Sequence, residues 1–158
     1  MIGLTVAIIT FNFIAFFTNK RLTKNQIVHI WTITISLQLL FDLYIDNKYH
    51  GYWYFSTDID EWWKELPTLI LLIPPVNMMF LNWYPFEKDL SKRILYIFCW
   101  LIAIFLYELL ALLPEPWGYF NYGWWGVKHT ILADPLLLLF ILYYYKWIRK
   151  IETISAGK

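Results

Sequence analysis

Long apolar stretches constrain the fold more than any other feature of this 158-residue sequence. Hydrophobic residues make up 59% of the chain and charged residues only 16%, which is far more apolar than a water-soluble domain of this size. A helix needs about 20 mostly apolar residues to cross the ~30 Å hydrocarbon core of a bilayer. Five stretches approach that length: Ile2–Phe17, Ile27–Ile45, Leu66–Tyr84, Ile94–Leu113 and His129–Trp147.

These stretches predict an all-α fold, a polytopic membrane bundle with five transmembrane helices. We expect a single domain over residues 1–150 and a short cytoplasmic tail over 151–158. Cys99 is the only cysteine, so a disulfide within the chain is excluded.

Basic residues are concentrated in three of the segments that flank these stretches. Segments 18–26, 85–93 and 146–158 hold three, three and four of the thirteen Lys and Arg residues. By the positive-inside rule these segments are cytoplasmic, which predicts an outer N-terminus and a cytoplasmic C-terminus. The net charge of +1 argues against nucleic acid as a partner, because nucleic acid requires a basic patch. Membrane lipids are the expected partners, with a second copy of the chain or another membrane protein as further candidates.

Three of the apolar stretches carry a carboxylate inside them: Asp42, Glu108 and Asp134. An ionised side chain in hydrocarbon costs several kcal/mol, so such an acid usually faces the protein interior or a water pocket and has a partner. Each of the three lies about one to one and a half helical turns from the outer end of its stretch. This shared depth predicts a small polar pocket in the outer leaflet.

A polar stripe in the second stretch points to the same pocket, because its members recur every four residues and therefore share one helical face. The stripe consists of Thr34, Gln38, Asp42 and Asp46. His129, at the outer start of the last stretch, is a nearby titratable group that could neutralise the acids. The predicted polar or ion site comprises Gln38, Asp42, Asp46, Glu108, His129 and Asp134.

The two outer loops, Asn47–Lys64 and Pro114–Lys128, are unusually aromatic. Trp and Tyr rings favour the headgroup level of a membrane because they are apolar at one end and polar at the other. We therefore expect both loops to lie on the outer interface and to cover the pocket, with Trp53, Trp124 and Trp125 as lid residues.

The same loops suggest an internal repeat. Asp42 precedes a Gly-Tyr-Trp segment by nine residues, Glu108 precedes a Gly-Tyr-Phe segment by ten, and a pair of tryptophans follows each (Trp62-Trp63 and Trp124-Trp125). The second and third stretches would then form one helical hairpin and the fourth and fifth another, related by an axis along the membrane normal. Chance similarity in an aromatic-rich chain is the alternative.

A Pro74-Pro75 pair interrupts the third stretch. Proline lacks the backbone N–H, so the helix should kink or open there, and the freed carbonyls need another donor. A neighbouring helix, a side chain such as Asn77, or water could supply it.

Most catalytic motifs are missing from the sequence. It has no Gly-rich phosphate loop, no histidine pair at i and i+4, and no nucleophile elbow, so we assign no catalytic residue and expect no cofactor. We favour a structural or accessory role in which the acids hold helices together. The alternatives are an ion, proton or small-solute handling protein that uses Asp42, Glu108 and Asp134, and a lipid-modifying enzyme with those acids on a metal.

The second half of the sequence resembles a known group of proteins. The run from Trp117 to Trp125 (WGYFNYGWW), the upstream Tyr107-Glu108 and the ending Tyr143–Lys146 are similar to a family of small uncharacterised multi-pass membrane proteins of spore-forming Gram-positive bacteria. In that family a Tyr/Asn-Gly-Trp segment follows a Glu-bearing helix and precedes a terminal helix that ends in aromatic and basic residues.

The resemblance covers roughly Asp42 to Lys150 and departs from the family pattern at Asp134-Pro135, where an apolar or small residue would be expected before the proline. It implies a bacterial cytoplasmic membrane, with the spore inner membrane as one candidate, and it implies no activity.

Overall fold

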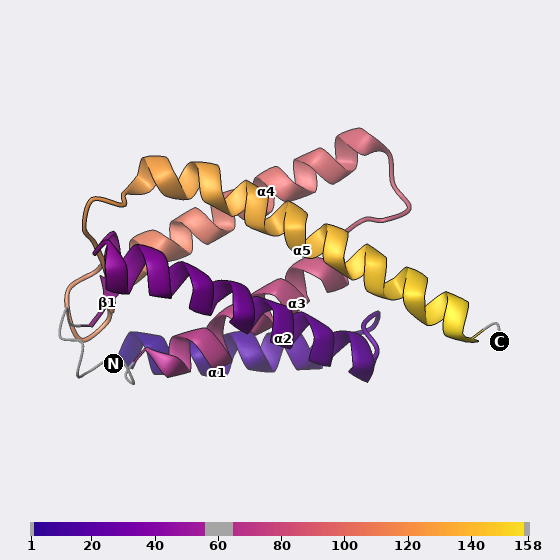
Figure 1. Cartoon of the computed structure of the whole chain (residues 1–158), viewed down its shortest axis with the longest axis horizontal. Helices are drawn as coiled ribbons and strands as arrows, with labels where there is room; N and C mark the ends of the chain where they lie inside the picture. The colour runs from indigo at the N-terminus through magenta and orange to yellow at the C-terminus, as the bar shows by residue number, and fades with distance from the viewer. Residues whose placement is uncertain (1, 56–64, 157–158) are drawn as a thin grey trace.

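The computed structural model describes residues 2–55 and 65–156, so Trp62 and Trp63 of the predicted repeat lie outside the described residues. The chain is mostly helical. Its α-helices are α1 (Ile2–Phe17), α2 (Lys24–Phe41), α3 (Ile73–Trp83), α4 (Leu90–Ala111) and α5 (Val127–Ala156), as Figure 1 shows. A π-helical segment, Asp42–Lys48, extends α2, and another, Thr68–Leu72, leads into α3.

Every predicted apolar stretch forms a helix, but not every helix is long enough for a membrane. Among the described residues, three helical stretches are long and apolar enough to cross one: Lys24–Asp46, Leu90–Ala111 and Val127–Ser155. Ile2–Phe17 and Thr68–Trp83 are shorter. The 16 residues of α1 cover about 24 Å, less than the ~30 Å of a typical hydrocarbon core. The structure thus supports three candidate spans, and five transmembrane helices are not supported by helix length.

Helix α5 does not end at residue 150, where we expected a tail to begin. It continues to Ala156, and its Glu152 accepts hydrogen bonds from the side chains of Asn25 (2.8 Å) and Gln26 (2.5 Å) at the start of α2. Residues 151–156 therefore belong to the helical bundle.

The segments that carry the basic residues gather at one end of the bundle, which is the right-hand end in Figure 1. The backbone N–H groups of Lys20 and Arg21 donate to Asn82 Oδ1 (3.1 and 3.2 Å), which joins the α1–α2 connection to the end of α3. The guanidinium of Arg149 in α5 lies over the ring of Phe86, 5.7 Å from its centroid. The two termini lie at opposite ends (Figure 1).

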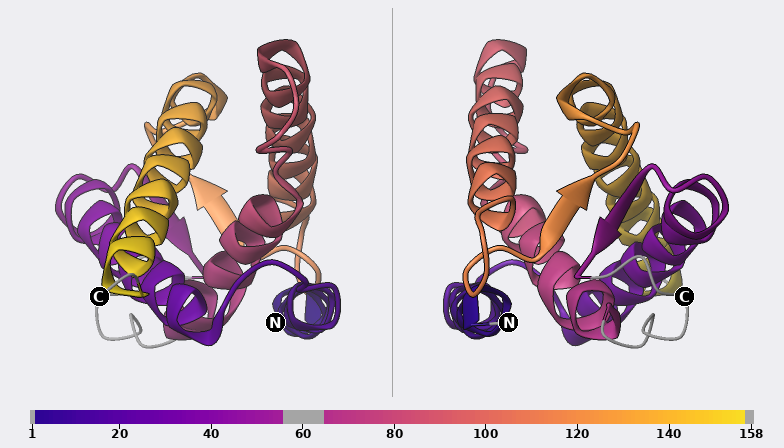
Figure 2. Two further views of the ribbon diagram at one scale, coloured as in Figure 1. Left: turned by 90° about the vertical axis from the view of Figure 1, so that its right-hand side faces the viewer. Right: turned by 90° about the vertical axis from the view of Figure 1, so that its left-hand side faces the viewer.

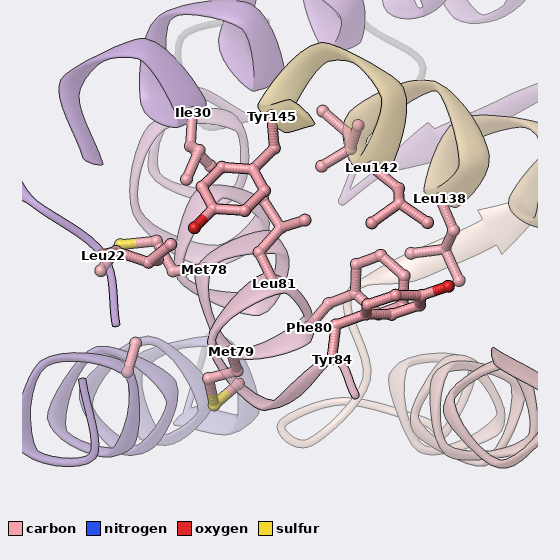
Figure 3. Close-up of a cluster of buried hydrophobic side chains, with 12 residues drawn as sticks. Leu22, Ile30, Met78, Met79, Phe80, Leu81, Tyr84, Leu138, Leu142 and Tyr145 are labelled. Carbon is pink, nitrogen blue, oxygen red and sulfur yellow. The ribbon is translucent and has the colours of Figure 1, made fainter. Parts of the chain in front are cut away.

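Helix α3 forms the centre of the fold although it is short. Seven of its eleven residues are buried, whereas Ala111 is the only buried residue recorded in the 22 residues of α4. Phe80 and Tyr145 are almost completely enclosed in the main apolar cluster, where α3 packs against α2 and α5 (Figure 3). The outward faces of the other helices are left apolar and exposed, as expected for a protein surrounded by lipid.

The Pro74-Pro75 pair lies in the first turn of α3, directly after the π-helical segment Thr68–Leu72, so a helical path passes through it. In a regular helix the N–H of residue 75 would bond to the carbonyl of Leu71, and proline removes that donor. Asn12 of α1 replaces it, because its Nδ2 donates to Leu71 O at 2.6 Å. Asn77, the side chain that we had considered, donates instead to a hydroxyl on α2.

The outer loops pair with each other instead of remaining irregular, which departs from the predicted all-α fold. Strands β1 (Tyr52–Tyr54) and β2 (Phe120–Tyr122) form a two-stranded antiparallel ribbon with Tyr52 opposite Tyr122. Aromatic residues favour such strands because their rings pack on a pleated surface. The ribbon lies at the end of the bundle opposite the basic segments (Figures 1 and 2).

Replacing Asn12 by Leu should lower the free energy of unfolding by about 1 kcal/mol, since hydrogen bonds between membrane helices average ~0.6 kcal/mol and reach ~1.7 kcal/mol. Unfolding by denaturant in detergent would measure the change. Ile9→Leu is the matched control, because Ile9 lies on the same helix and is 64% exposed. Equal unfolding midpoints for the two variants would mean that the bond to Leu71 does not stabilise the fold.

Candidate functional site

A cavity of about 370 Å³ lies among the helices, within the size range of small-molecule sites. Its walls come from one regular face each of α4 and α5, with lining residues three or four positions apart. These are Trp100, Ala103, Ile104, Tyr107, Glu108 and Ala111 of α4, and Thr130, Ala133, Asp134, Leu137, Leu138 and Ile141 of α5. The alanines provide the space, because larger side chains at those positions would fill it.

Aromatic side chains close the cavity at the end where the ribbon lies. This roof consists of Tyr52, Tyr54, Tyr119, Phe120 and Trp125. Hydroxyl contacts fix it, since the hydroxyls of Tyr107 and Tyr119 lie 2.6 Å apart. Of the predicted lid residues, only Trp125 lines the cavity.

The other two predicted lid residues lie outside the cavity. Trp124 is 52% exposed, and its Nε1 donates to the carbonyl of Tyr49 at 2.7 Å. Trp53 lies between two buried tyrosines in β1 and is itself only half-buried, because successive strand residues point to opposite faces.

The floor of the cavity is formed by Trp100, whose ring packs against α3. Its ring centroid lies 5.8 Å from that of Phe80 and 6.0 Å from that of Tyr96. Tyr96 also donates its hydroxyl to the Phe80 carbonyl at 2.9 Å. Aromatic rings therefore line the cavity at both ends.

Asp42 is held beneath the ribbon by two donors. Its Oδ1 accepts hydrogen bonds from the Tyr52 hydroxyl (2.6 Å) and from Gln38 Nε2 (3.0 Å), and only 3% of the residue is exposed. Burial raises the pKa of the Tyr52 hydroxyl, so that it remains a proton donor. Asp46, one turn further along, is also buried and is hydrogen-bonded to Glu65.

Glu108 is held in a corresponding way by a tyrosine of the other strand. Its Oε1 accepts hydrogen bonds from the Tyr122 hydroxyl (2.5 Å) and from Thr130 Oγ1 (3.1 Å). Asp134 lies near Glu108, because it is one turn beyond Thr130 on α5 and also lines the cavity. Since Tyr52 and Tyr122 are direct cross-strand partners, each strand supplies one tyrosine to one carboxylate.

The predicted acids therefore form two groups. Glu108 and Asp134 lie together, while Asp42 and Asp46 lie with Glu65. His129 is engaged elsewhere, because its Nδ1 accepts the N–H of Gly126 (3.1 Å) and its ring stacks on Trp125 at 5.1 Å. In residues 2–55 and 65–156, no group of three or more His, Cys, Asp or Glu side chains could hold a metal ion.

Three buried polar atoms in the cavity wall have no hydrogen-bond partner among the described residues: Thr68 Oγ1, Trp100 Nε1 and Glu108 Oε2. An unpaired buried polar group costs about 1–3 kcal/mol, and native proteins contain few of them. Thr68, Trp100 and Glu108 all line the cavity, so its wall contains an unpaired hydroxyl, an unpaired N–H donor and an unpaired carboxylate oxygen.

Our sequence analysis missed three members of this site, Glu65, Thr68 and Trp100. Glu65 lies directly before the third apolar stretch and Thr68 lies in its first turn. An acid so near the end of a hydrophobic segment could have indicated a buried role. Trp100 lies eight residues before Glu108, a spacing that places both on one helical face. That face would have been recognisable from the alternation of alanines with polar and aromatic residues.

The stability of the protein should depend on the protonation of Glu65. Burial, together with the nearby Asp46 and Asp42 carboxylates, raises the pKa of Glu65 from 4.5 to about 8, and the protonated Glu65 donates to Asp46. The folded state therefore retains a proton that the unfolded state releases above pH 4.5. This contribution to stability is complete below pH 4.5 and is lost as the pH rises through about 8.

Thermal unfolding in detergent should accordingly show a Tm that falls as the pH rises from 4.5 to about 8 and levels off above that. In Glu65→Gln the fall should be smaller, because an amide does not ionise. Glu115→Gln, at an exposed position in the other loop, is the control and should keep the slope of the parent protein. If Tm depends on pH equally in Glu65→Gln and in the parent protein, Glu65 is not the group responsible for the dependence.

Comparisons with known proteins leave the family open. No protein-family model, no curated protein and no solved structure matches this chain. The resemblance to membrane proteins of spore-forming bacteria therefore stays a prediction.

Proposed function

We propose that the chain is an integral membrane protein with an accessory, non-catalytic role, and that its cavity holds a lipid-like molecule. The observation that carries this proposal is the cavity itself. It has aromatic rings at both ends, is apolar along most of its walls, and has three lining residues with an unpaired polar atom. Ligand sites in proteins combine a mostly apolar wall with a few polar groups in the same way.

The outer surface supports a position within the membrane. Large apolar side chains are exposed on α1, α4 and α5, for example Phe13, Phe98 and Leu132. We propose that the two shorter helices also lie in the bilayer. Helix α1 packs along the π-helical segment Thr68–Leu72 and along α3. A short helix can be accommodated by local thinning of the bilayer at modest cost. The basic end then faces the cytoplasm of a bacterial cell.

The dimensions of the cavity fit a single hydrocarbon chain. From Trp100 to Ala111 the lining face of α4 extends for about 16 Å, roughly half of the ~30 Å hydrocarbon core and thus about one leaflet. Helices α4 and α5 diverge from each other in Figure 2, and the cavity-lining Ala103 is exposed. A chain could therefore enter sideways from the surrounding lipid.

The arrangement of the acids favours a binding role over ion handling or metal-dependent catalysis. Calcium takes six to eight oxygen ligands, whereas the described acids are divided into two groups that are engaged by tyrosines. A proton-handling role retains one supporting observation, which is the hydrogen bond between Asp46 and Glu65. Both groups could instead serve to fix the ribbon over the cavity.

The ribbon also supports the proposed internal repeat. An antiparallel strand pair has a local two-fold axis, which in this register passes between Trp53 and Asn121 and relates Tyr52 to Phe120 and Tyr54 to Tyr122. The two tyrosine–carboxylate contacts are therefore not equivalent under this axis, and it is the strand pair itself that supports the repeat. We propose that α2 with α3, and α4 with α5, are equivalent hairpins around this axis. The axis would run along the membrane normal.

A photoreactive probe would test the binding role. A diazirine-bearing long-chain alcohol, added to the protein in phosphatidylcholine nanodiscs, should label peptides from the inner faces of α4 and α5. Ala133→Phe should lose most of this labelling because the larger ring fills the cavity. Leu132→Phe, which changes the neighbouring lipid-facing residue, should keep it. Labelling that is spread evenly over exposed residues, and equal in both variants, would contradict the proposal.

The proposed orientation can be tested separately. A reporter fused after Lys158 should be active in the cytoplasm, and cysteines introduced in the Pro114–Lys128 loop should react with an impermeant thiol reagent from outside. Labelling of that loop from the cytoplasmic side would show that the orientation is reversed.

A further inference from the structure

We propose that the cavity selects amphiphiles with a cationic nitrogen at one end, such as a long-chain amine or amino alcohol, and that Glu108 and Asp134 hold this group. The inference rests on the proposed binding role and assigns the polar end of the ligand. Three observations support it: the hydrogen bonds that Glu108 makes, the absence of an ion-pair partner for Glu108 and Asp134 among the described residues, and the aromatic rings that line this end of the cavity.

The two oxygens of Glu108 differ in their surroundings. Oε1 already accepts hydrogen bonds from Tyr122 and Thr130, whereas Oε2 is buried without a partner among the described residues. A carboxylate oxygen accepts hydrogen bonds and, when ionised, binds ammonium groups more strongly than neutral donors. The open position therefore requires a ligand that donates.

The charge of the pair points in the same direction. Glu108 and Asp134 both line the cavity and carry like charges when both are ionised, and within residues 2–55 and 65–156 no ion pair joins either carboxylate to a Lys, Arg or His. An ammonium group between the two carboxylates would remove the repulsion. An anionic headgroup would bring a third negative charge to the same place and would be rejected.

Other lining residues near Glu108 suit a cation as well. Tyr107 is joined to the roof through Tyr119, and Trp125 packs beside Tyr52, so aromatic rings flank this end of the cavity. Such rings attract cations through their negative faces. Thr68, which is 1% exposed, lines the cavity with a hydroxyl oxygen that has no partner in the described chain. It could bond to a ligand hydroxyl or N–H.

Competition against the photoreactive alcohol would test the headgroup. Dodecylamine, dodecanol and dodecanoic acid have the same alkyl chain, so differences in how well they compete report the effect of the polar group. Each compound is compared between variants in the same nanodiscs. In the parent protein the amine should compete at least about tenfold better than the acid, since a hydrogen bond to a charged group contributes about 1.5–3 kcal/mol. Glu108→Gln should remove most of this preference while dodecanol still competes.

Asp134→Asn is a second test variant in case Glu108→Gln does not fold. It should also reduce the preference for the amine over the acid. Glu115→Gln, an exposed acid outside the cavity, should leave the preference unchanged. Equal competition by amine and acid, or an amine preference that survives both cavity variants, would overturn the headgroup assignment and leave the binding role intact. Failure of the binding role would appear differently, as labelling that Ala133→Phe does not reduce.

Discussion

The short ribbon between the two outer loops is the interaction on which the rest of the structure depends. Its cross-strand pair, Tyr52 and Tyr122, supplies a hydroxyl to Asp42 on one side and to Glu108 on the other. Without these donors each acid would lie in an apolar bundle at a cost of several kcal/mol. The ribbon thus makes the buried acids tolerable, and the acids in turn fix the ribbon over the cavity.

Much of the fold could be predicted from the sequence, because hydrophobic length and the distribution of basic residues are local properties. Each apolar stretch forms a helix, and the bounds of α1 agree with the predicted Ile2–Phe17. Membrane crossing by all five was not supported, since two helices are shorter than a typical span. Composition identifies apolar helices more readily than it identifies which of them reach across a bilayer.

The site was less predictable, because it depends on contacts between distant segments. The expected role of Asp42 and Glu108 as buried, partnered acids agrees with their contacts, but their partners are tyrosines delivered by strand pairing, which no helical periodicity indicates. The expected pairing of His129 with the acids was replaced by a local bond to Gly126 and stacking on Trp125. The acids form two groups because the two tyrosines of the ribbon bind acids on different elements, Asp42 after α2 and Glu108 on α4.

The uneven attachment of α4 has a consequence for how quickly a bound molecule could be exchanged. Its contacts with the core run from Tyr96 to Ala111, but only Ala111 of its 22 residues is buried, whereas seven of the eleven residues of α3 are buried. Segments with few buried contacts open with much smaller free energies than the global unfolding of a domain. Outward motion of α4 would therefore set the residence time of the ligand without any disruption of the α2–α3–α5 core.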